Sequence, residues 1–453
     1  MTTIGTSTTL GINLMGPTYA NPISIASGVM ISSSGLAIYA GAASGSWTIQ
    51  NSGTVLGGSI SNGIDLLAGG LIINTSPGVI TGDGDGIGIY DDIGTVVNAG
   101  RIGGTLGNGV ALAAGGAVTN ASSASITGYG DGVYIRHAAG TVVNYGSITG
   151  TSTIGEGAHL FQGGSVSNAA SATMSGTEFG VLIEVAAGTV TNAGSIAGTS
   201  GTGIGVGLYY GGSVTNAASA SITGGADGVL IILAPGTVVN DGSIAATGAA
   251  GDGVALKFGG LINNGTSASI AGSGNGDGIR VLLHDATVVN QGSIAGAGTA
   301  GEGIYFQSGG SVSNAASASI SGGDDGVLIT GVAGTVVNAG VVRGTGDGGI
   351  ILNSGGLVTN AVHASIVGGH EGIVVNGSEG TVINDGSITG LGGTLLAIST
   401  GVYLFAGGSV TNGASALIEG PRSVVVAHGV GVVVNDGSMA GGPDGGVLLL
   451  SGG

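Results

Sequence analysis

The chain has 453 residues, of which 104 are glycine and only 7% are charged, whereas average proteins contain about 7% glycine and about 25% charged residues. Hydrophobic residues still make up 42% of the chain, so it does not fit the composition of disordered proteins. Collagen is excluded because glycine does not recur at every third residue. A formal charge of −18 repels phosphate groups, which excludes nucleic acid as a partner.

Cysteine is absent, so disulfides, thiol nucleophiles and cysteine-based metal sites are excluded. No stretch approaches the roughly 20 apolar residues that a membrane-spanning helix needs. The first residues, MTTIGTSTTLGINLMG, lack the basic region of a secretory signal peptide. We therefore expect no membrane-spanning segment and see no export signal at this N-terminus.

Residues 1–34 match the rest of the chain poorly and contain Pro17 and Pro22. We expect them to form an N-terminal cap or an irregular first coil, because the open end of a stacked repeat is an unpaired strand edge.

Residues 35–453 form one repeat that is marked by asparagine. Seventeen times an apolar residue is followed two positions later by Asn, usually 24 residues after the previous one, with extremes of 22 and 28. A stacked Asn can hydrogen-bond both to its own turn and to the next Asn, so we interpret the series as a structural ladder. Its members are Asn51, Asn74, Asn98, Asn120, Asn144, Asn168, Asn192, Asn216, Asn240, Asn264, Asn290, Asn314, Asn338, Asn360, Asn384, Asn412 and Asn435.

Two versions of the repeat alternate. In one, the next apolar residue comes four positions after Asn, as in NAGSI, and in the other it comes six positions after, as in NAASASI. A longer loop later in the short version restores the length, which gives a super-repeat of 48 residues made of two coils.

Each repeat contains three short runs in which apolar and small or polar residues alternate, as in GVALKFGG, GTVVN and GSIAG. This period of two, with Gly, Asp and Asn between the runs, indicates strands and turns. Three short strands in about 24 residues are typical of one coil of a parallel β-helix. The sequence therefore predicts an all-β, single-stranded parallel β-helix (β-solenoid) of about 17 coils, with Val229, Ile231, Val238 and Ile244 pointing inward.

Repeats such as GTVVNAGSI and GGSVTNAASASI resemble those of right-handed parallel β-helices in autotransporter passenger domains and adhesin-like proteobacterial surface proteins. The resemblance covers about residues 35–453. It implies an extracellular or cell-surface location and a structural or adhesive role. The chain differs from those proteins because neither an export signal nor an outer-membrane anchor is visible.

An acidic column is predicted at one corner of the coil. Two residues before each first inward position stand Asp85, Asn108, Asp131, Glu156, Phe179, Ile204, Asp227, Asp252, Asp277, Glu302, Asp325, Gly348 and Glu371. Five consecutive coils carry a carboxylate there, at Asp227, Asp252, Asp277, Glu302 and Asp325. Either Asp before Gly is simply turn chemistry, or these five residues bind Ca²⁺ between coils, since carboxylate oxygens are its preferred ligands.

Aromatic residues gather at the outward positions of the same strand. Together with basic side chains they form a candidate ligand face of Tyr90, Tyr134, Phe161, Tyr209, Tyr305, Tyr403, Phe405, Arg136 and Arg280, to which His159, Lys257 and His428 add. Exposed rings suit contact with a glycan or a cell-surface protein. The alternative is that aromatic residues are ordinary strand formers.

We expect a structural protein without catalytic residues: an adhesin, a rigid surface spacer or a self-assembling matrix filament, as in a biofilm. The C-terminal GGVLLLSGG, residues 445–453, stops before the next repeat motif, which fits either a fragment of a passenger domain or head-to-tail self-association. The enzymatic alternative is a polysaccharide-degrading β-helix similar to pectate lyases, with Asp252, Asp277 and Glu302 beside Lys257 and Arg280. Against it, no long insertion builds a cleft there.

Overall fold

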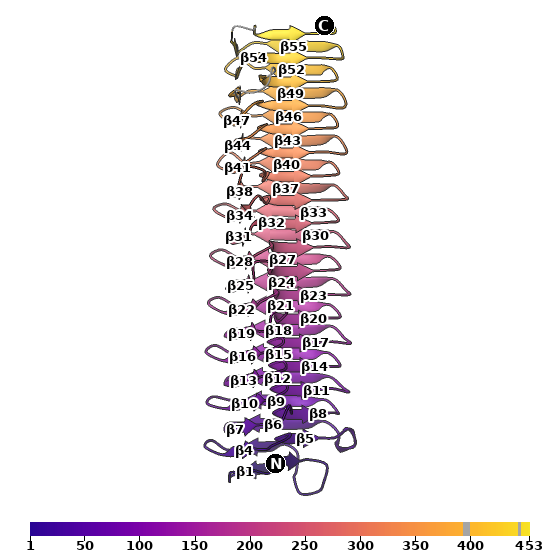
Figure 1. Cartoon of the computed structure of the whole chain (residues 1–453), viewed down its shortest axis with the longest axis vertical. Helices are drawn as coiled ribbons and strands as arrows, with labels where there is room; N and C mark the ends of the chain where they lie inside the picture. Colours follow the sequence, from indigo (N-terminus) through magenta and orange to yellow (C-terminus); the bar gives the residue numbers. More distant parts are fainter. Residues whose placement is uncertain (393–398, 443–444) are drawn as a thin grey trace. The chain divides into compact units, whose positions relative to one another are not determined.

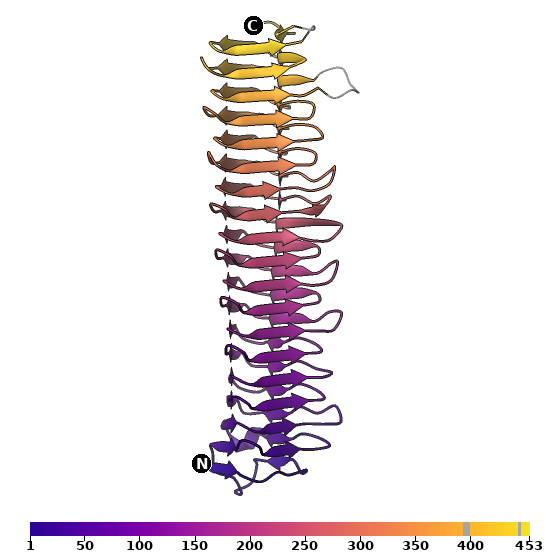
Figure 2. The same ribbon diagram turned by 90° about the vertical axis from the view of Figure 1, so that its left-hand side faces the viewer.

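The computed structural model describes residues 1–392, 399–442 and 445–453. Two compact units are present, Met1–Gly225 and Ala226–Gly453, and each is described by itself. Both are parallel β-solenoids, in which short strands of successive coils stack above one another (Figures 1 and 2). Together they contain about 18 coils of ~24 residues with three strands per coil. The predicted fold class is therefore confirmed.

Unit 1 contains three parallel sheets, and each complete coil contributes one strand to each sheet. The first sheet consists of β1 (Thr2–Ile4), β3 (Ile23–Ile25), β6 (Trp47–Asn51), β9 (Gly70–Asn74), β12 (Gly94–Asn98), β15 (Gly116–Asn120), β18 (Gly140–Asn144), β21 (Gly164–Asn168), β24 (Gly188–Asn192) and β27 (Gly212–Asn216). The second sheet consists of β4 (Met30–Ser32), β7 (Thr54–Leu56), β10 (Val79–Gly82), β13 (Arg101–Gly104), β16 (Ser125–Gly128), β19 (Ser147–Gly150), β22 (Thr173–Gly176), β25 (Ser195–Gly198) and β28 (Ser221–Gly224). The third sheet consists of β2 (Ile12–Asn13), β5 (Ile38–Ala40), β8 (Ile64–Leu66), β11 (Ile87–Ile89), β14 (Val110–Leu112), β17 (Val133–Ile135), β20 (Glu156–Leu160), β23 (Phe179–Ile183) and β26 (Ile204–Leu208).

Unit 2 repeats this arrangement. Its first sheet consists of β30 (Gly236–Asn240), β33 (Gly260–Asn264), β37 (Ala286–Asn290), β40 (Gly310–Asn314), β43 (Gly334–Asn338), β46 (Gly356–Asn360), β49 (Gly380–Asn384), β52 (Gly408–Asn412) and β55 (Gly431–Asn435). Its second sheet consists of β31 (Ser243–Ala246), β34 (Ser269–Ala271), β38 (Ser293–Ala295), β41 (Ser319–Gly322), β44 (Val341–Gly344), β47 (Ser365–Gly368), β50 (Ser387–Gly390), β53 (Leu417–Gly420) and β56 (Ser438–Gly441). Its third sheet consists of β29 (Asp227–Ile231), β32 (Ala250–Leu256), β36 (Ile279–Val281), β39 (Ile304–Phe306), β42 (Val327–Ile329), β45 (Ile350–Leu352), β48 (Ile373–Val375), β51 (Thr400–Leu404), β54 (Arg422–Val426) and β57 (Val447–Leu449).

Two elements fall outside this scheme. The short β35 (Ser273–Gly274) pairs antiparallel with the start of β32. The 3₁₀ helix η1 (Ala42–Ser44) is the one helical segment among the described residues.

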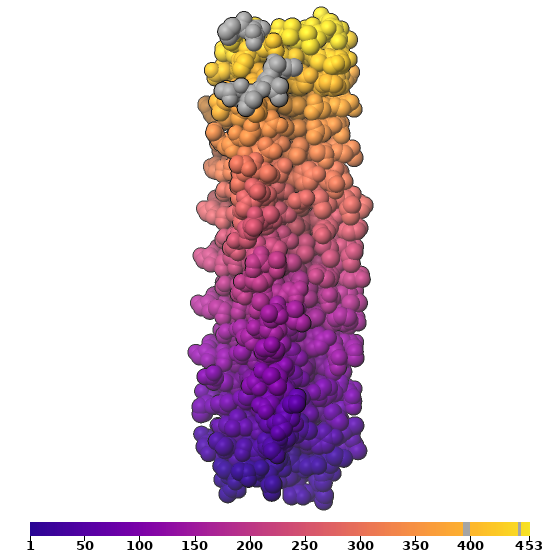
Figure 3. Space-filling model, viewed as in Figure 1, coloured from indigo at the N-terminus to yellow at the C-terminus, as the bar shows by residue number. Residues whose placement is uncertain are grey.

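The core of each unit is made of aliphatic columns that run through successive coils. The inward residues predicted from the sequence, Val229, Ile231, Val238 and Ile244, are all fully buried. Equivalent residues pair in exact register from coil to coil, as Val96 does with Val118 in β12 and β15. Because each strand repeats the same pattern, the same side chains meet again at every level of a unit. Figure 3 shows one face of the outer surface that covers these columns.

Glycine pairs are needed at the corner before the first sheet in every second coil. Gly163 and Gly164 have φ values of 79° and 129°, a region that other residues rarely adopt. A Cβ on Gly164 would also lie 2.1 Å from the Gly140 carbonyl oxygen. Both the backbone angle and the close approach of two successive coils therefore require glycine here.

Residues 1–34, the expected cap, contain β1 to β4. These strands pair in parallel with the following coils, β1 with β3 and β3 with β6. In that register Ile25 stands opposite Asn51, so apolar residues hold the ladder position in the first coils. Counting by asparagine therefore gives fewer coils than the structure contains.

Candidate functional site

The predicted asparagines lie at the ends of the first-sheet strands, stacked in register within each unit. In unit 1, the amide nitrogen Nδ2 of Asn144 donates to Oδ1 of Asn168 at 2.8 Å and to the carbonyl of Thr173 at 2.9 Å. The N–H of Gly146 donates to Oδ1 of Asn144 at 3.1 Å. Asn144 is fully buried. The amide is thus occupied by the fold, and no part of it faces a ligand.

The two alternating versions of the repeat differ in the turn after this Asn. In the short version Nδ2 donates to the carbonyl two residues on, as from Asn98 to Gly100, and in the long version four residues on, as from Asn120 to Ala124. The same amide therefore closes both turns.

A second ladder runs along the acidic column. At this corner a side-chain Oδ1 accepts the main-chain N–H of the equivalent residue one coil later. In unit 1 the acceptors are Asn62, Asp85, Asn108 and Asp131, at 2.6, 2.6, 2.8 and 3.1 Å. In unit 2 they are Asp227, Asp252, Asp277 and Asp325, at 3.2, 2.8, 2.9 and 2.7 Å. We refer to these series as the corner ladder.

Burial and neighbouring carboxyl groups raise the pKa values of the corner ladder in unit 2. Burial raises the pKa of Asp277 to about 9, and its contact with Glu302 adds to the effect. Burial likewise raises the pKa of Asp325 to about 8, and burial together with Asp252 raises that of Asp227 to about 6. Asp277 is only 2% exposed, and its second oxygen, Oδ2, has no hydrogen-bond partner. This carboxyl group is therefore costly to ionise where it stands.

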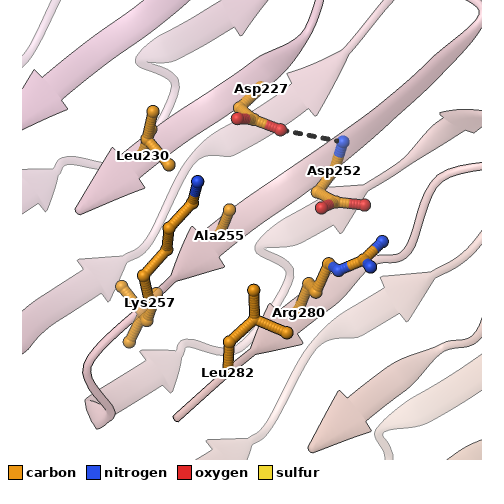
Figure 4. Close-up of a pocket in the computed structure, with 8 residues that line it drawn as sticks. Asp227, Leu230, Asp252, Ala255, Lys257, Arg280 and Leu282 are labelled. Carbon is orange, nitrogen blue, oxygen red and sulfur yellow. Dashed lines mark hydrogen bonds between the residues drawn. The ribbon is translucent and has the colours of Figure 1, made fainter. Parts of the chain in front are cut away.

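A hollow of about 260 Å³ lies beside this ladder (Figure 4), lined by Asp227, Leu230, Asp252, Ala255, Leu256, Lys257, Arg280 and Leu282. Leu230, Ala255 and Leu282 supply its apolar side, and Lys257 and Arg280 its positive charge. Nη1 of Arg280 lies 3.9 Å from Oδ2 of Asp277. The structure therefore brings the two predicted basic residues together with Asp227 and Asp252, whereas Asp277 and Glu302 are not part of the lining.

A different cluster forms in unit 1, where Asp131, Glu156 and His159 place one ligand atom each within 4.8 Å of one another. We name these three residues the His159 cluster. Nδ1 of His159 lies 3.7 Å from Oδ2 of Asp131, and Nε2 lies 3.0 Å from Oε2 of Glu184. The carboxylates come from the corner ladder and the imidazole from the outward face of β20.

Burial and neighbouring charges shift the pKa values of the residues in the His159 cluster. Burial alone would raise the pKa of Asp131, but the imidazole of His159 and hydrogen bonds from Glu156 outweigh it and lower the pKa. Burial, followed by the neighbouring Asp131, raises the pKa of Glu156 to about 10. Burial opposes a positive charge on His159, but Asp131 and Glu184 outweigh it, so its pKa is raised.

A second mixed cluster lies in unit 2, where Asp347, His370 and Glu371 also bring three ligand atoms together. It is more open, because the side chains of His370 and Asp347 are 42% and 49% exposed. Burial and the charge of Asp347 raise the pKa of Glu371 to about 7. Among the described residues only these two groups gather three such ligands, and neither is the set predicted to bind calcium.

The candidate ligand face is divided into separate groups. In unit 1, His159 lies between Tyr134 and Phe161, with ring centroids 5.0 and 6.1 Å away, and Arg136 lies over Tyr134. In unit 2, Arg280 lies over the ring of Tyr305 at 5.6 Å.

The other predicted aromatic residues take local partners. Tyr403, Phe405 and His428 form a further group of rings in unit 2. In unit 1, Tyr209 packs on Phe179, and the Tyr90 hydroxyl accepts a hydrogen bond from Asn62.

No family model, no curated protein and no solved structure matches the chain. Within the described residues, no helix has the length and apolar character to cross a membrane. The support for any function therefore comes from the side chains themselves.

Three residues that matter here escaped the sequence analysis: Asn62, Glu184 and Asp347. Asn62 precedes Gly63 just as Asp85 precedes the next glycine of its kind, so the corner position was visible but was followed only from Asp85. Glu184 and His159 lie one coil apart in neighbouring outward columns. Aligning every column, rather than the acidic one alone, would have placed them together.

Proposed function

We propose that this chain is a structural β-solenoid without catalytic activity, located outside the cell or on its surface, where it acts as a rigid spacer, an adhesin or a matrix filament. One observation carries the proposal: within each unit, the repeated polar positions of the coil form hydrogen bonds within the fold. The asparagine amides bond to one another and to the turns, and the corner side chains accept main-chain N–H groups. The repeated polar residues of this chain therefore stabilise the regular stacking of the coils.

Location is the first test. Antibody labelling and protease shaving of intact cells that produce the protein are expected to reach it at the surface or in the surrounding matrix. A signal that appears only after lysis would contradict the proposal.

Adhesion would depend on the groups of partly exposed rings. Tyr134 with Phe161 and Tyr403 with Phe405 present aromatic area beside polar groups, which suits a glycan or a cell-surface protein. A glycan array probed with the whole chain and with Tyr403→Ser tests this part. Equal binding by both would exclude that group.

The enzymatic alternative is a lyase or hydrolase for acidic polysaccharides, and it is favoured only by the hollow that holds Lys257 and Arg280 beside Asp227 and Asp252. We expect no turnover of polygalacturonate with calcium present, followed by viscosity and by release of new chain ends. Activity that Lys257→Met or Arg280→Gln abolishes, and that Arg343→Gln on the second sheet retains, would overturn the structural proposal.

Calcium binding by the corner ladder of unit 2 belongs to this proposal as a stabilising feature. Its support is the buried Oδ2 of Asp277, which has no hydrogen-bond partner, next to the carboxylate of Glu302. Hydrogen exchange of the whole chain, measured with millimolar calcium and with chelator, is expected to show more protection around β36 and β39 when calcium is present. Identical protection in both would remove calcium from the proposal.

A further inference from the structure

The His159 cluster differs in composition from the stretches of the acidic column that hold carboxylates alone. It combines one imidazole with two carboxylates, and its ligand atoms lie within 4.8 Å of one another. The other mixed group among the described residues, Asp347, His370 and Glu371, is more open to solvent. Imidazole nitrogen is a ligand for first-row transition ions such as Zn²⁺, whereas calcium prefers an all-oxygen site.

The orientation of His159 is determined by Glu184. Because Nε2 lies 3.0 Å from Oε2 of Glu184, a neutral imidazole donates its one proton there and leaves the lone pair of Nδ1 toward Asp131. A carboxylate that orients a ligating histidine through its other nitrogen is a recurrent feature of zinc sites. Glu184 is not one of the three proposed ligands, and its contact with Nε2 leaves Nδ1 as the ring nitrogen that faces Asp131.

The distance between Nδ1 of His159 and Asp131 fits two ligands of one metal ion better than a hydrogen bond. Nδ1 of His159 and Oδ2 of Asp131 are 3.7 Å apart, too far for a hydrogen bond. Two ligands that each lie about 2.1 Å from a shared tetrahedral ion are separated by roughly 3.4 Å. A small shift of either side chain would therefore accommodate the ion.

Asp131 can serve the ladder and a metal at once. Its Oδ1 accepts the N–H of Glu156 at 3.1 Å, which leaves Oδ2 for the cluster. Glu156 is only 7% exposed, and among the described residues no cationic side chain forms an ion pair with it. The acidic side chains of Asp131, Glu156 and Glu184 therefore surround a single imidazole.

An entry path is present as well. A hollow of about 640 Å³ opens over the cluster, and Tyr129, Ser152 and Ile154 form part of its wall. Residues 151–155, between β19 and β20, form the loop at its edge. The open side leaves room for water or another small ligand to complete the coordination.

We propose that Asp131, Glu156 and His159 bind a first-row transition dication of the Zn²⁺ class, with Glu184 as the residue that positions His159. The site lies within unit 1 and uses the corner ladder as its support. It is distinct from the calcium ligands expected in unit 2.

Isothermal titration of the whole chain with Zn²⁺, after removal of metals by a chelator, tests the proposal. We expect one tight site, with Ca²⁺ bound more than about 100-fold more weakly. His159→Gln and Asp131→Asn are each expected to weaken zinc binding by more than about 100-fold. Asp131→Asn keeps an Oδ1 acceptor, and Asn62 and Asn108 already hold this ladder position with full backbone hydrogen bonds, so the ladder is preserved.

Two further variants separate the site from its surroundings. Glu184→Gln keeps all three ligands and is expected to weaken binding by about 10-fold to 100-fold, as loss of a positioning partner does. His370→Gln alters the more open cluster of unit 2 and is expected to leave the tight site unchanged.

The proposal is overturned if the wild-type chain binds no zinc, if Asp131→Asn and His159→Gln bind it like wild type, or if His370→Gln removes it. Should a ligand variant fail to fold, hydrogen exchange of the wild-type chain decides instead. Zinc is expected to slow exchange in β20, and unchanged exchange there would also overturn the proposal.

Discussion

The corner ladder is built differently in the two units. In unit 1, Asn62 and Asn108 alternate with Asp85 and Asp131, whereas unit 2 uses Asp227, Asp252 and Asp277 in succession. The hydrogen bonds to the main chain are similar, from 2.6 to 3.1 Å in the first and from 2.7 to 3.2 Å in the second. The ladder therefore requires a side-chain oxygen and does not require a charge.

The charge has separate consequences in each unit. In unit 1, His159 contributes to lowering the pKa of Asp131. In unit 2, burial and the neighbouring Glu302 both raise the pKa of Asp277, because like charges disfavour ionisation. The same backbone geometry thus places an imidazole beside a corner carboxyl group in one unit and a second carboxyl group beside it in the other.

The largest loss of stability is expected in the asparagine ladder, which is built alike in both units. Asn144→Ala in unit 1 and Asn338→Ala in unit 2 each remove a buried amide that accepts from the turn and bonds to the next Asn. Each is expected to reduce the local free energy of unfolding by about 3 kcal/mol or more, since several buried groups lose their partners. Site-resolved hydrogen exchange measures both, and clearly unequal losses would contradict the equivalence of the two asparagine ladders.

A smaller loss of stability should differ between the corner ladders of the two units. Asn108→Ala leaves the N–H of Asp131 without its acceptor and is expected to destabilise its coil by about 1–3 kcal/mol. Asp252→Ala removes the acceptor of the Asp277 N–H, but it also removes a charge that raises the pKa of Asp227. Its net loss is expected to be under about 1 kcal/mol near neutral pH. Equal losses in hydrogen exchange would show that the charge in unit 2 carries no penalty.

Asp277→Asn should stabilise unit 2, with a pH dependence. The folded pKa of Asp277 is raised to about 9 from 3.8, so the folded state holds more protons than the unfolded one, and stability falls as pH rises between about 4 and about 9. An amide keeps the Oδ1 acceptor without this loss. Near neutral pH, we expect a gain of about 1–3 kcal/mol.

Denaturation or local exchange, followed across that pH range, checks this expectation. The variant should show a flatter pH dependence than the wild type, and the two should converge below about pH 4. Asp85→Asn in unit 1 makes the same exchange between two ladder asparagines, where burial also raises the pKa of the carboxyl group. It is expected to flatten the pH dependence less, because no acidic side chain among the described residues touches Asp85 as Glu302 touches Asp277. A variant curve parallel to that of the wild type would contradict the assignment of the pH dependence to Asp277.

The smallest loss of stability is expected for Arg280→Gln. Its guanidinium lies 3.9 Å from Oδ2 of Asp277, and the side chain is 46% exposed, so solvent screens the pair. We expect a loss of less than about 1 kcal/mol, reduced further by salt. A larger loss, insensitive to salt, would mean that Arg280 compensates the column more than its exposure indicates.

The fold followed from the sequence to an unusual degree. The inward residues Val229 and Ile231, the position of Asn144 at a strand end and the three strands per coil were all readable, because a solenoid repeats one local pattern. Coils without the marker, such as the one that contains Ile25, were not counted, since they fill the ladder position with an apolar residue.

What the sequence by itself determined is the coil: its period, its inward columns and the residues that stack at each corner. Tertiary structure alone decided what those stacks do. Asp131 and His159 are 28 residues apart in the chain, and Glu184 lies a further coil on, yet their side chains meet, because pairing of Tyr134 with His159 and of His159 with Leu182 sets the register between coils. A corner carboxylate can accept an N–H, face another carboxylate or face an imidazole. Which of these occurs depends on the register between coils and on burial, and the order of residues alone specifies neither.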